Sequence, residues 1–176
     1  MNFYDLIFTD TTGSQISMTN FRGMVVLIVN TATRCGLAPQ FEGIERLHQT
    51  YRNQGLAVIG FPCNQFLNQE PESDASMVQI CNIRFGVTFT LSEKIEVNGR
   101  NTHPVFVYLK KKLPGGLFGS TIKWNFTKFL ITAQGVPFRR YAPTVSPDAL
   151  EKEIVTLLAD KASTDDSAGT IIPPRQ

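Results

Sequence analysis

Apolar residues alternate or cluster along the chain in patterns that predict its strands. Residues 3–18 alternate on either side of Thr12 and Gly13, a turn pair, which predicts a short hairpin at the edge of a larger structure. Residues 24–30 and 56–61 are continuous apolar runs rich in β-branched side chains. Such runs are typical of strands that are covered on both faces, as in a parallel sheet.

A helix is predicted between these two runs. Pro39 suits the first turn of a helix, and Gly55 ends the pattern. The positions that share one apolar stripe at helical spacing are Phe41, Ile44, Leu47 and Tyr51. A strand, a helix and a strand in this order indicate a parallel βαβ crossover, so we expect the α/β fold class.

The second half of the chain is expected to add helices and an antiparallel hairpin. The predicted elements are a helix capped by Ser73, an extended KIEV segment (94–97) before the Asn98–Gly99 turn, a helix from Pro104 to about Lys112, a hairpin of 128–133 and 136–141, and a helix opened by Ser146 and Pro147. We expect residues 1–160 to form one domain. Residues 161–176 are small, polar and without periodicity, which predicts a disordered tail.

Composition and charge exclude several classes of protein. Of the 176 residues, 42% are hydrophobic and 18% charged, which is too apolar for a disordered chain. A net charge of +2 without a basic block gives no electrostatic reason to expect nucleic acid or an anionic membrane as partner. The apolar run at 24–29 is far shorter than the roughly 20 residues that span a bilayer. Because the N-terminus has no secretory pattern, we expect a cytoplasmic protein.

Three cysteines are the candidate reactive groups. Cys35 follows the first buried strand and precedes Pro39, so its sulfur should lie near a helix N-terminus, where unpaired N–H groups and Arg34 favour a thiolate. Cys81 falls on the apolar face of the second predicted helix. There it either packs in the core or traps a sulfenic acid on Cys35 as a disulfide. Cys63, at the end of the second strand, is interpreted as a packing residue.

Other chemistries have little support in the sequence. The chain has no C-x-x-C, and His48 and His103 have no metal-ligand spacing, so we expect no metal site. So few histidines also argue against a Cys-His hydrolase. The glycine-rich stretch at 115–120 lacks the Lys-Ser/Thr of a phosphate loop. We therefore expect no cofactor.

Four separated blocks, taken together, closely resemble the glutathione peroxidase family. They are NTATRCG around Cys35, FPCNQFLNQEP at 61–71, the EVNG turn at 96–99 and WNFTKFL at 124–130. They occur in the family's order, and the resemblance covers residues 3–158. It implies a thioredoxin fold with an N-terminal β-hairpin and an inserted helix, in which helices flank a central mixed sheet.

The resemblance also implies a catalytic set. Cys35 would be the peroxidatic residue, and Gln69, Trp124 and Asn125 would complete the family's tetrad, to which Gln65 in the same loop would not belong. Amide and indole N–H groups are neutral donors that can stabilise a thiolate and align a peroxide. The chain would then be a peroxidase whose substrate is hydrogen peroxide or an organic hydroperoxide.

Cys81 matches the resolving cysteine of family members that resemble two-cysteine, thioredoxin-dependent peroxidases. The implied cycle is oxidation of Cys35 to a sulfenic acid, condensation with Cys81, and reduction of the disulfide by thioredoxin. A glutathione-dependent peroxidase and a peroxide sensor that passes oxidation to a partner protein remain alternatives. The segment between His103 and Trp124 lacks the insertion that mediates tetramer assembly in some relatives, which implies a monomer or weak dimer.

The chain departs from the family pattern around Cys35. The departures from the family's usual NVAS and CGxT are Thr31, Thr33 and Ala38. The missing hydroxyl at Ala38 is expected to weaken the capping of the following helix. Glu72 stands where Gly is common after QEP, which is expected to alter the turn into the second helix.

Overall fold

Two buried parallel strands form the centre of the protein. The computed structural model describes residues 2–116 and 119–168. Strands β3 (Val25–Thr31) and β4 (Leu56–Pro62) are buried along their whole length and pair in parallel. Helix α1 (Gln40–Tyr51) connects them, so the predicted βαβ unit is confirmed.

The sheet is completed by one parallel edge strand and an antiparallel hairpin. Its order is β5-β4-β3-β6-β7, where β5 is Thr90–Leu91, β6 is Lys128–Ile131 and β7 is Pro137–Tyr141. Strand β6 pairs antiparallel with both β3 and β7, and β5 pairs in parallel with β4. The predicted α/β class with a mixed sheet is therefore confirmed.

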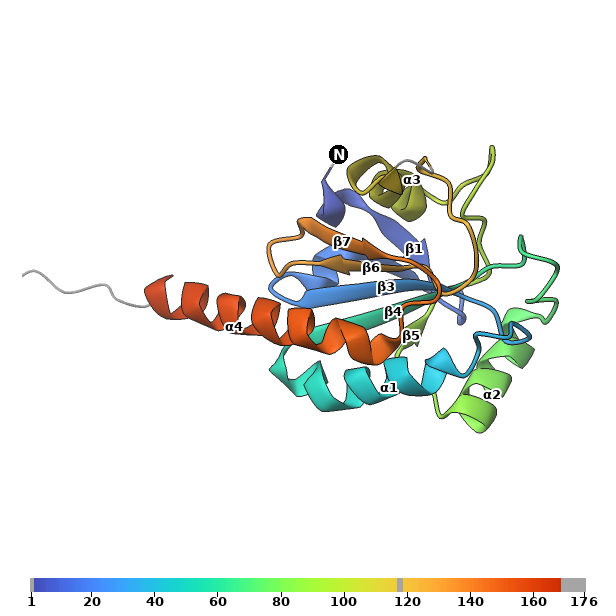
Figure 1. Cartoon of the computed structure of the whole chain (residues 1–176), viewed down its shortest axis with the longest axis horizontal. Coiled ribbons are helices and arrows are strands. Elements are labelled where there is room, and N and C mark those ends of the chain that lie inside the picture. The colour runs from blue at the N-terminus through green and yellow to red at the C-terminus, as the bar shows by residue number, and fades with distance from the viewer. Residues whose placement is uncertain (1, 117–118, 169–176) are drawn as a thin grey trace, which may run out of the picture.

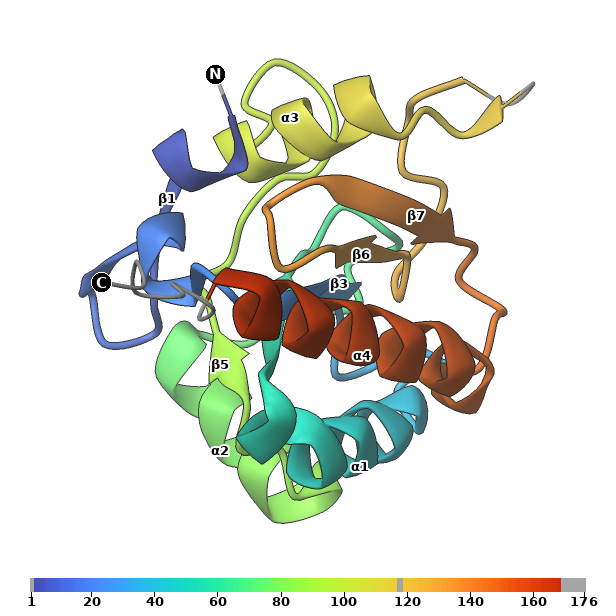
Figure 2. The ribbon, with the colours of Figure 1, turned by 90° about the vertical axis from the view of Figure 1, so that its left-hand side faces the viewer.

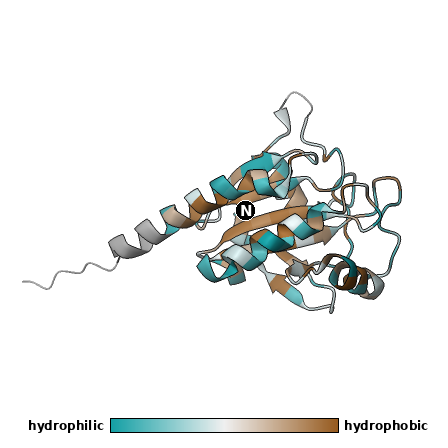
Figure 3. Ribbon diagram, turned by 60° about the horizontal axis from the view of Figure 1, so that its bottom comes forward, coloured by the Kyte–Doolittle hydropathy of each residue, from teal (hydrophilic) through white to brown (hydrophobic). Residues whose placement is uncertain are grey.

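Helices and a small hairpin cover the two faces of this sheet (Figures 1 and 2). One face packs against α1 and α4 (Glu151–Ala168), with α2 (Asp74–Phe85) beside α1. The other face packs against α3 (Pro104–Lys112) and the hairpin of β1 (Ile7–Thr9) and β2 (Gln15–Ser17). Figure 3 shows the hydrophobic strands enclosed between these more hydrophilic layers. Short 3₁₀ turns occur at Phe3–Asp5, Met18–Phe21, Arg52–Gln54 and Pro147–Leu150.

Two details differ from the sequence prediction. The edge strand β5 consists of Thr90 and Leu91, which pair with β4. The KIEV segment follows this strand and is not part of it. The tail predicted from Lys161 onward is wrong at its start, since α4 continues to Ala168. Residues 161–168 contain neither Gly nor Pro, so nothing in their sequence ends the helix. The rest of the predicted tail, 169–176, lies outside the described residues.

Within the described part of the chain, no helix is long and apolar enough to cross a lipid bilayer.

Candidate active site

Three loops meet at one edge of the sheet, on the right in Figure 1. The Cys35 loop (residues 32–39) follows β3, and the Gln69 loop (residues 63–73) follows β4. Because β6 runs antiparallel to β3, the Trp124 turn (residues 124–127), which precedes β6, lies at this edge too. In α/β sheets the carboxyl ends of parallel strands are the usual place for a ligand site.

Cys35 lies in the first of these loops with its sulfur close to backbone N–H groups. The side chain is 5% exposed, and the N–H of Leu37 donates to Sγ at 3.4 Å. The chain then enters α1 through consecutive turns, beginning with the N–H of Ala38 donating to the carbonyl of Cys35 at 2.9 Å. Helix α1 begins at Gln40, and its N-cap residue, Pro39, provides no side-chain hydrogen bond. This arrangement places Cys35 shortly before the N-terminus of α1.

The amides of Gln69 and Asn125 form a pair beside this loop. Asn125 Nδ2 donates to Gln69 Oε1 at 3.0 Å. The amide NH2 group of Gln69 and the second N–H of Asn125 Nδ2 remain as donors. The N–H of Arg34, next to Cys35, donates to the carbonyl of Gln69 at 3.0 Å. Asn125 is fully buried, and its Oδ1 has no hydrogen-bond partner among the described residues. A buried acceptor without a partner is a candidate contact for a ligand.

Trp124 is half-buried and packs against the Gln69 loop, with its ring 5.6 Å from that of Phe66. Its turn is held by Asn30, a fully buried residue near the end of β3. Asn30 Nδ2 donates to the carbonyl of Trp124 at 3.2 Å, and Asn30 Oδ1 accepts the N–H of Thr127 at 3.1 Å. The structure thus brings together the loops of Cys35, Gln69, Trp124 and Asn125.

Backbone strain occurs next to both amide residues. Among the described residues other than glycine, three have positive φ: Leu67 at 50°, Asn68 at 54° and Phe126 at 63°. The first two directly precede Gln69, and Phe126 directly follows Asn125. Such conformations cost about 1–3 kcal/mol each and cluster at functional sites. The strain identifies these two loops independently of any sequence motif.

Glu70 ties the Gln69 loop to the Cys35 loop. Its carboxylate accepts the N–H of Thr33 at 2.7 Å and the Thr33 hydroxyl at 2.8 Å, and both residues are buried. Burial raises the pKa of Glu70 above its usual value, and the two Thr33 bonds oppose the rise. Thr33, a departure from the family pattern, is therefore one side of the contact that joins the two loops.

Cys81 lies in a different environment from Cys35. It is on α2, which Ser73 caps as predicted, with the Ser73 side chain accepting the N–H of Ser76 at 3.3 Å. The Cys81 side chain is fully buried, and burial, with a smaller contribution from the charge of Glu70, raises its pKa to about 12. Cys81 and Cys35 belong to the same core cluster. Both are free thiols.

Cys63 and Gln65 lie elsewhere. Cys63 is fully buried in the core cluster on the opposite face of the sheet, where burial raises its pKa. Gln65 Oε1 accepts the N–H groups of Val97 and Asn98 at 2.8 and 3.0 Å. Cys63 therefore lies in a different core cluster from Cys35 and Cys81, and Gln65 holds the Asn98 turn.

Glu72 forms an ion pair at the turn that leads into α2. Glu72 pairs with Arg34 of the Cys35 loop, and the carbonyl of Glu72 accepts Lys94 Nζ at 2.5 Å. The side chain of Arg34 is mostly exposed, so the pair is worth less than about 1 kcal/mol. It adds a second, weaker connection between the Cys35 and Gln69 loops.

Sequence reasoning missed Asn30 and Glu70 as parts of the site. Each carried a signal. Asn30 is a polar residue inside an otherwise apolar buried strand, and Glu70 is an acidic residue next to the predicted tetrad glutamine. A buried polar side chain must find a partner, which here lies in a neighbouring loop.

Comparisons with known proteins agree with this geometry. A family model described as glutathione peroxidase matches residues 3–110. The "Glutathione peroxidase" of Lactococcus lactis subsp. cremoris is 49% identical over 158 residues, which cover 90% of this chain and all of that protein. The "Glutathione peroxidase-like peroxiredoxin gpx1" of Schizosaccharomyces pombe is 47% identical over 158 residues, covering 89% of this chain and 99% of that protein. The crystal structure of T. cruzi GPX1 superposes with a TM-score of 0.75 at 32% identity, covering 90% of this chain and 97% of that one.

Proposed function

The chain belongs to the glutathione peroxidase family, and we propose that this peroxidase works with two cysteines, Cys35 and Cys81, and takes its electrons from thioredoxin. Its thioredoxin fold is that of the family. The observation that carries the proposal is the meeting of the Cys35 loop with the Gln69–Asn125 amide pair at one edge of the sheet.

In the first step the Cys35 thiolate attacks the terminal oxygen of the hydroperoxide. The O–O bond breaks, Cys35 becomes a sulfenic acid, and the other oxygen leaves as water or an alcohol after taking a proton. The N–H protons of Gln69 and Asn125 that the amide pair leaves free would donate to the sulfur or the peroxide oxygens. The partnerless Asn125 Oδ1 is available to accept the peroxide O–H.

In the second step Cys81 attacks the sulfenic sulfur. A Cys35–Cys81 disulfide forms, and the sulfenic oxygen leaves as water with the proton of Cys81. Because Cys81 is fully buried and its pKa is about 12, we expect α2 to open locally before this step. The disulfide then exchanges with the dithiol of thioredoxin, which restores both thiols.

The presence of Cys81 in the same core cluster as Cys35 favours an internal resolving thiol over glutathione. The Schizosaccharomyces pombe relative carries the word peroxiredoxin in its name, which agrees with a cysteine-based cycle. Cys63 has no part in the proposal, since it packs in the cluster on the opposite face.

Steady-state turnover of hydrogen peroxide tests the proposal. With thioredoxin and its reductase, we expect wild-type turnover, a loss of about a thousandfold or more in Cys35→Ser, and no thioredoxin-supported cycling in Cys81→Ser. Cys81→Ser should still reduce one equivalent of peroxide. Cys63→Ser is the matched control and should turn over as wild type does. Wild-type rates that are higher with glutathione than with thioredoxin, and full cycling of Cys81→Ser, would contradict the proposed reductant and resolving residue.

A further inference from the structure

Helix α2 is held at both ends, and Cys81 lies close to one of them. The helix lies beside α1 (Figure 2) and spans Asp74–Phe85, so Cys81 is near its C-terminal end. The carbonyl of Cys81 accepts the N–H of Val87, just beyond the helix, at 3.1 Å. Ser73, which caps the helix, is at the opposite end. The contacts that hold the segment after α2 therefore also hold Cys81.

Glu45 of α1 binds this segment through Thr88. Its carboxylate accepts the N–H of Thr88 at 2.9 Å and the Thr88 hydroxyl at 2.5 Å. The side-chain amide of Gln49 donates to Glu45 Oε1 and to Thr88 Oγ1, both at 2.6 Å. Together these bonds form the Glu45–Thr88 contact, which joins α1 to the chain directly after α2.

The carboxylate of Glu45 enters this contact in its ionised form. Glu45 is 9% exposed. Burial raises its pKa, but the hydrogen bonds from Thr88 and Gln49 and the charge of His48 outweigh burial, so the pKa lies below its usual value. Hydrogen bonds to an ionised group are roughly twice as strong as those between neutral groups. One carboxylate therefore contributes much of the attachment of Thr88.

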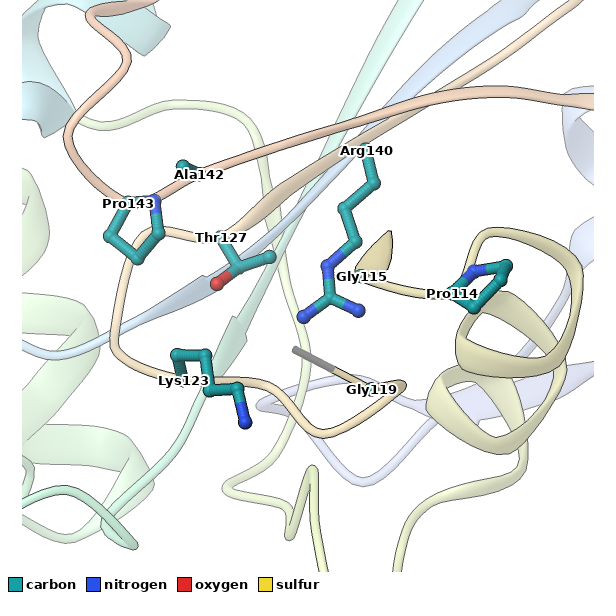
Figure 4. Close-up of a pocket in the computed structure, with 8 residues that line it drawn as sticks. All are labelled: Pro114, Gly115, Gly119, Lys123, Thr127, Arg140, Ala142 and Pro143. Atoms are coloured by element: carbon teal, nitrogen blue, oxygen red, sulfur yellow. The ribbon is translucent and has the colours of Figure 1, made fainter. Parts of the chain in front are cut away.

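The other surroundings of α2 are apolar or open. The Phe85 ring stacks on Phe41 of α1, with 5.0 Å between the ring centroids. Elsewhere a cavity of about 490 Å³ borders Val78 and Asn82 of α2. It is distinct from the cavity beside the Trp124 turn that Figure 4 shows. Because part of α2 borders open space, its contacts with α1 contribute more to keeping it closed.

We propose that Glu45 and Thr88 are positioning residues for the second step of the cycle, in that their contact holds the C-terminal end of α2 closed and so sets the rate at which Cys81 reaches the Cys35 sulfenic acid. The inference rests on the proposed function and deepens it, since a resolving Cys81 has to leave the core. The chemistry is that of the second step: an S–S bond forms, the S–O bond breaks, and water leaves with the proton of Cys81. Loss of the contact should speed this step and leave the first one unchanged.

Thr88→Val tests the contact at an exposed position. It removes the hydroxyl that donates to Glu45 and accepts from Gln49, and it keeps the backbone N–H and the shape of the side chain. The reduced protein is mixed with one equivalent of hydrogen peroxide, quenched at set times and mapped by mass spectrometry. We expect the Cys35–Cys81 disulfide to form about fivefold to tenfold faster than in the wild type, with the rate of Cys35 oxidation unchanged. Glu45→Gln, which removes the charge, should accelerate the same step at least as much.

Alkylation of Cys81 in the reduced protein measures the contact independently of peroxide. A fully buried thiol reacts with iodoacetamide only during rare local openings, so Thr88→Val should raise the rate at Cys81 by the same factor. Ser73→Ala is the matched control, because it removes an exposed hydroxyl from the opposite end of α2. It should change the alkylation and disulfide rates of Cys81 by less than about twofold.

Unchanged rates in Thr88→Val, or an equal acceleration in Ser73→Ala, would overturn the proposed role of the Glu45–Thr88 contact. Slower oxidation of Cys35 in Thr88→Val would overturn it too, because the residue would then act on the first step. If the wild type forms no Cys35–Cys81 disulfide, the proposed function fails, and the alkylation rates still show whether the contact holds α2 closed.

Discussion

The Cys35 loop and helix α2 each carry one of the two cysteines, and the surroundings of the two sulfurs are opposite in character. Cys35 lies in a loop where a backbone N–H points at its sulfur, and polar contacts tie its loop to the neighbouring one. Cys81 lies inside a helix, with Met77 Sδ 3.7 Å from its sulfur. Burial at the second site raises the pKa of the Cys81 thiol.

The different environments of Cys35 and Cys81 suit the different roles that the two cysteines have in the proposed cycle. In the proposed cycle, the residue that meets peroxide has to be positioned before the substrate arrives, and hydrogen bonds to its loop favour this. The resolving residue of that cycle has to stay unreactive until Cys35 is oxidised, and the burial of Cys81 and its raised pKa favour this. Helix α2 would then need to open only after the first oxidation.

The largest expected difference is in thiol alkylation. With a pKa of about 12, Cys81 in the folded protein has about a thousandfold less thiolate at pH 8 than an ordinary thiol. We expect iodoacetamide to modify Cys35 completely before Cys81 reacts, and Cys81 to react faster as the pH rises from 8 toward 11. Peptide mapping after timed quenching measures both rates. Comparable alkylation rates of Cys35 and Cys81 at pH 8 would show that the two sulfurs do not differ in reactivity as expected.

A smaller effect is expected when the tie between the loops is cut. Glu70→Ala leaves the buried N–H and hydroxyl of Thr33 without their acceptor, which costs about 1–3 kcal/mol in the free energy of unfolding. It also frees the Gln69 loop, so kcat/KM for hydrogen peroxide should fall about tenfold. Glu70→Gln keeps an acceptor for the N–H and can donate to the hydroxyl, so it should recover most of the activity.

Glu72→Ala is the matched control for Glu70→Ala, since among the described residues the side chain of Glu72 forms an ion pair only with the exposed Arg34. Its effect on the free energy of unfolding should stay below about 1 kcal/mol, with little change in kcat/KM. Urea titrations and initial rates provide both quantities. If Glu72→Ala impaired turnover as much as Glu70→Ala, the buried carboxylate would not be the contact that orders the loops.

The same two regions show which parts of the fold can be predicted from the sequence. The periodicity around β3, α1 and β4 predicted the βαβ unit, because burial on both faces leaves a continuous apolar run. The position of Cys81 on the apolar face of α2 followed from helical spacing.

The contacts between loops could not be predicted in this way. The bonds from Asn30 to the Trp124 turn and from Thr33 to Glu70 join residues far apart in the chain, and no periodicity encodes such partners. The positive φ of Phe126 cannot be predicted from the sequence either, because a bulky residue adopts such a backbone conformation only under tertiary constraint. Helix α4 is longer than the sequence pattern predicts, because a polar composition does not end a helix where Gly and Pro are absent.

The proposed cycle depends on the pairing of Cys35 with Cys81, which a single oxidation experiment can detect. The reduced protein is treated with one equivalent of hydrogen peroxide, free thiols are blocked at the quench, and peptides are mapped by mass spectrometry. We expect a Cys35–Cys81 disulfide with Cys63 still free. Oxidised Cys35 beside an unmodified Cys81 would contradict it and indicate an external resolving thiol, and an unmodified Cys35 would contradict the proposed role of Cys35 itself.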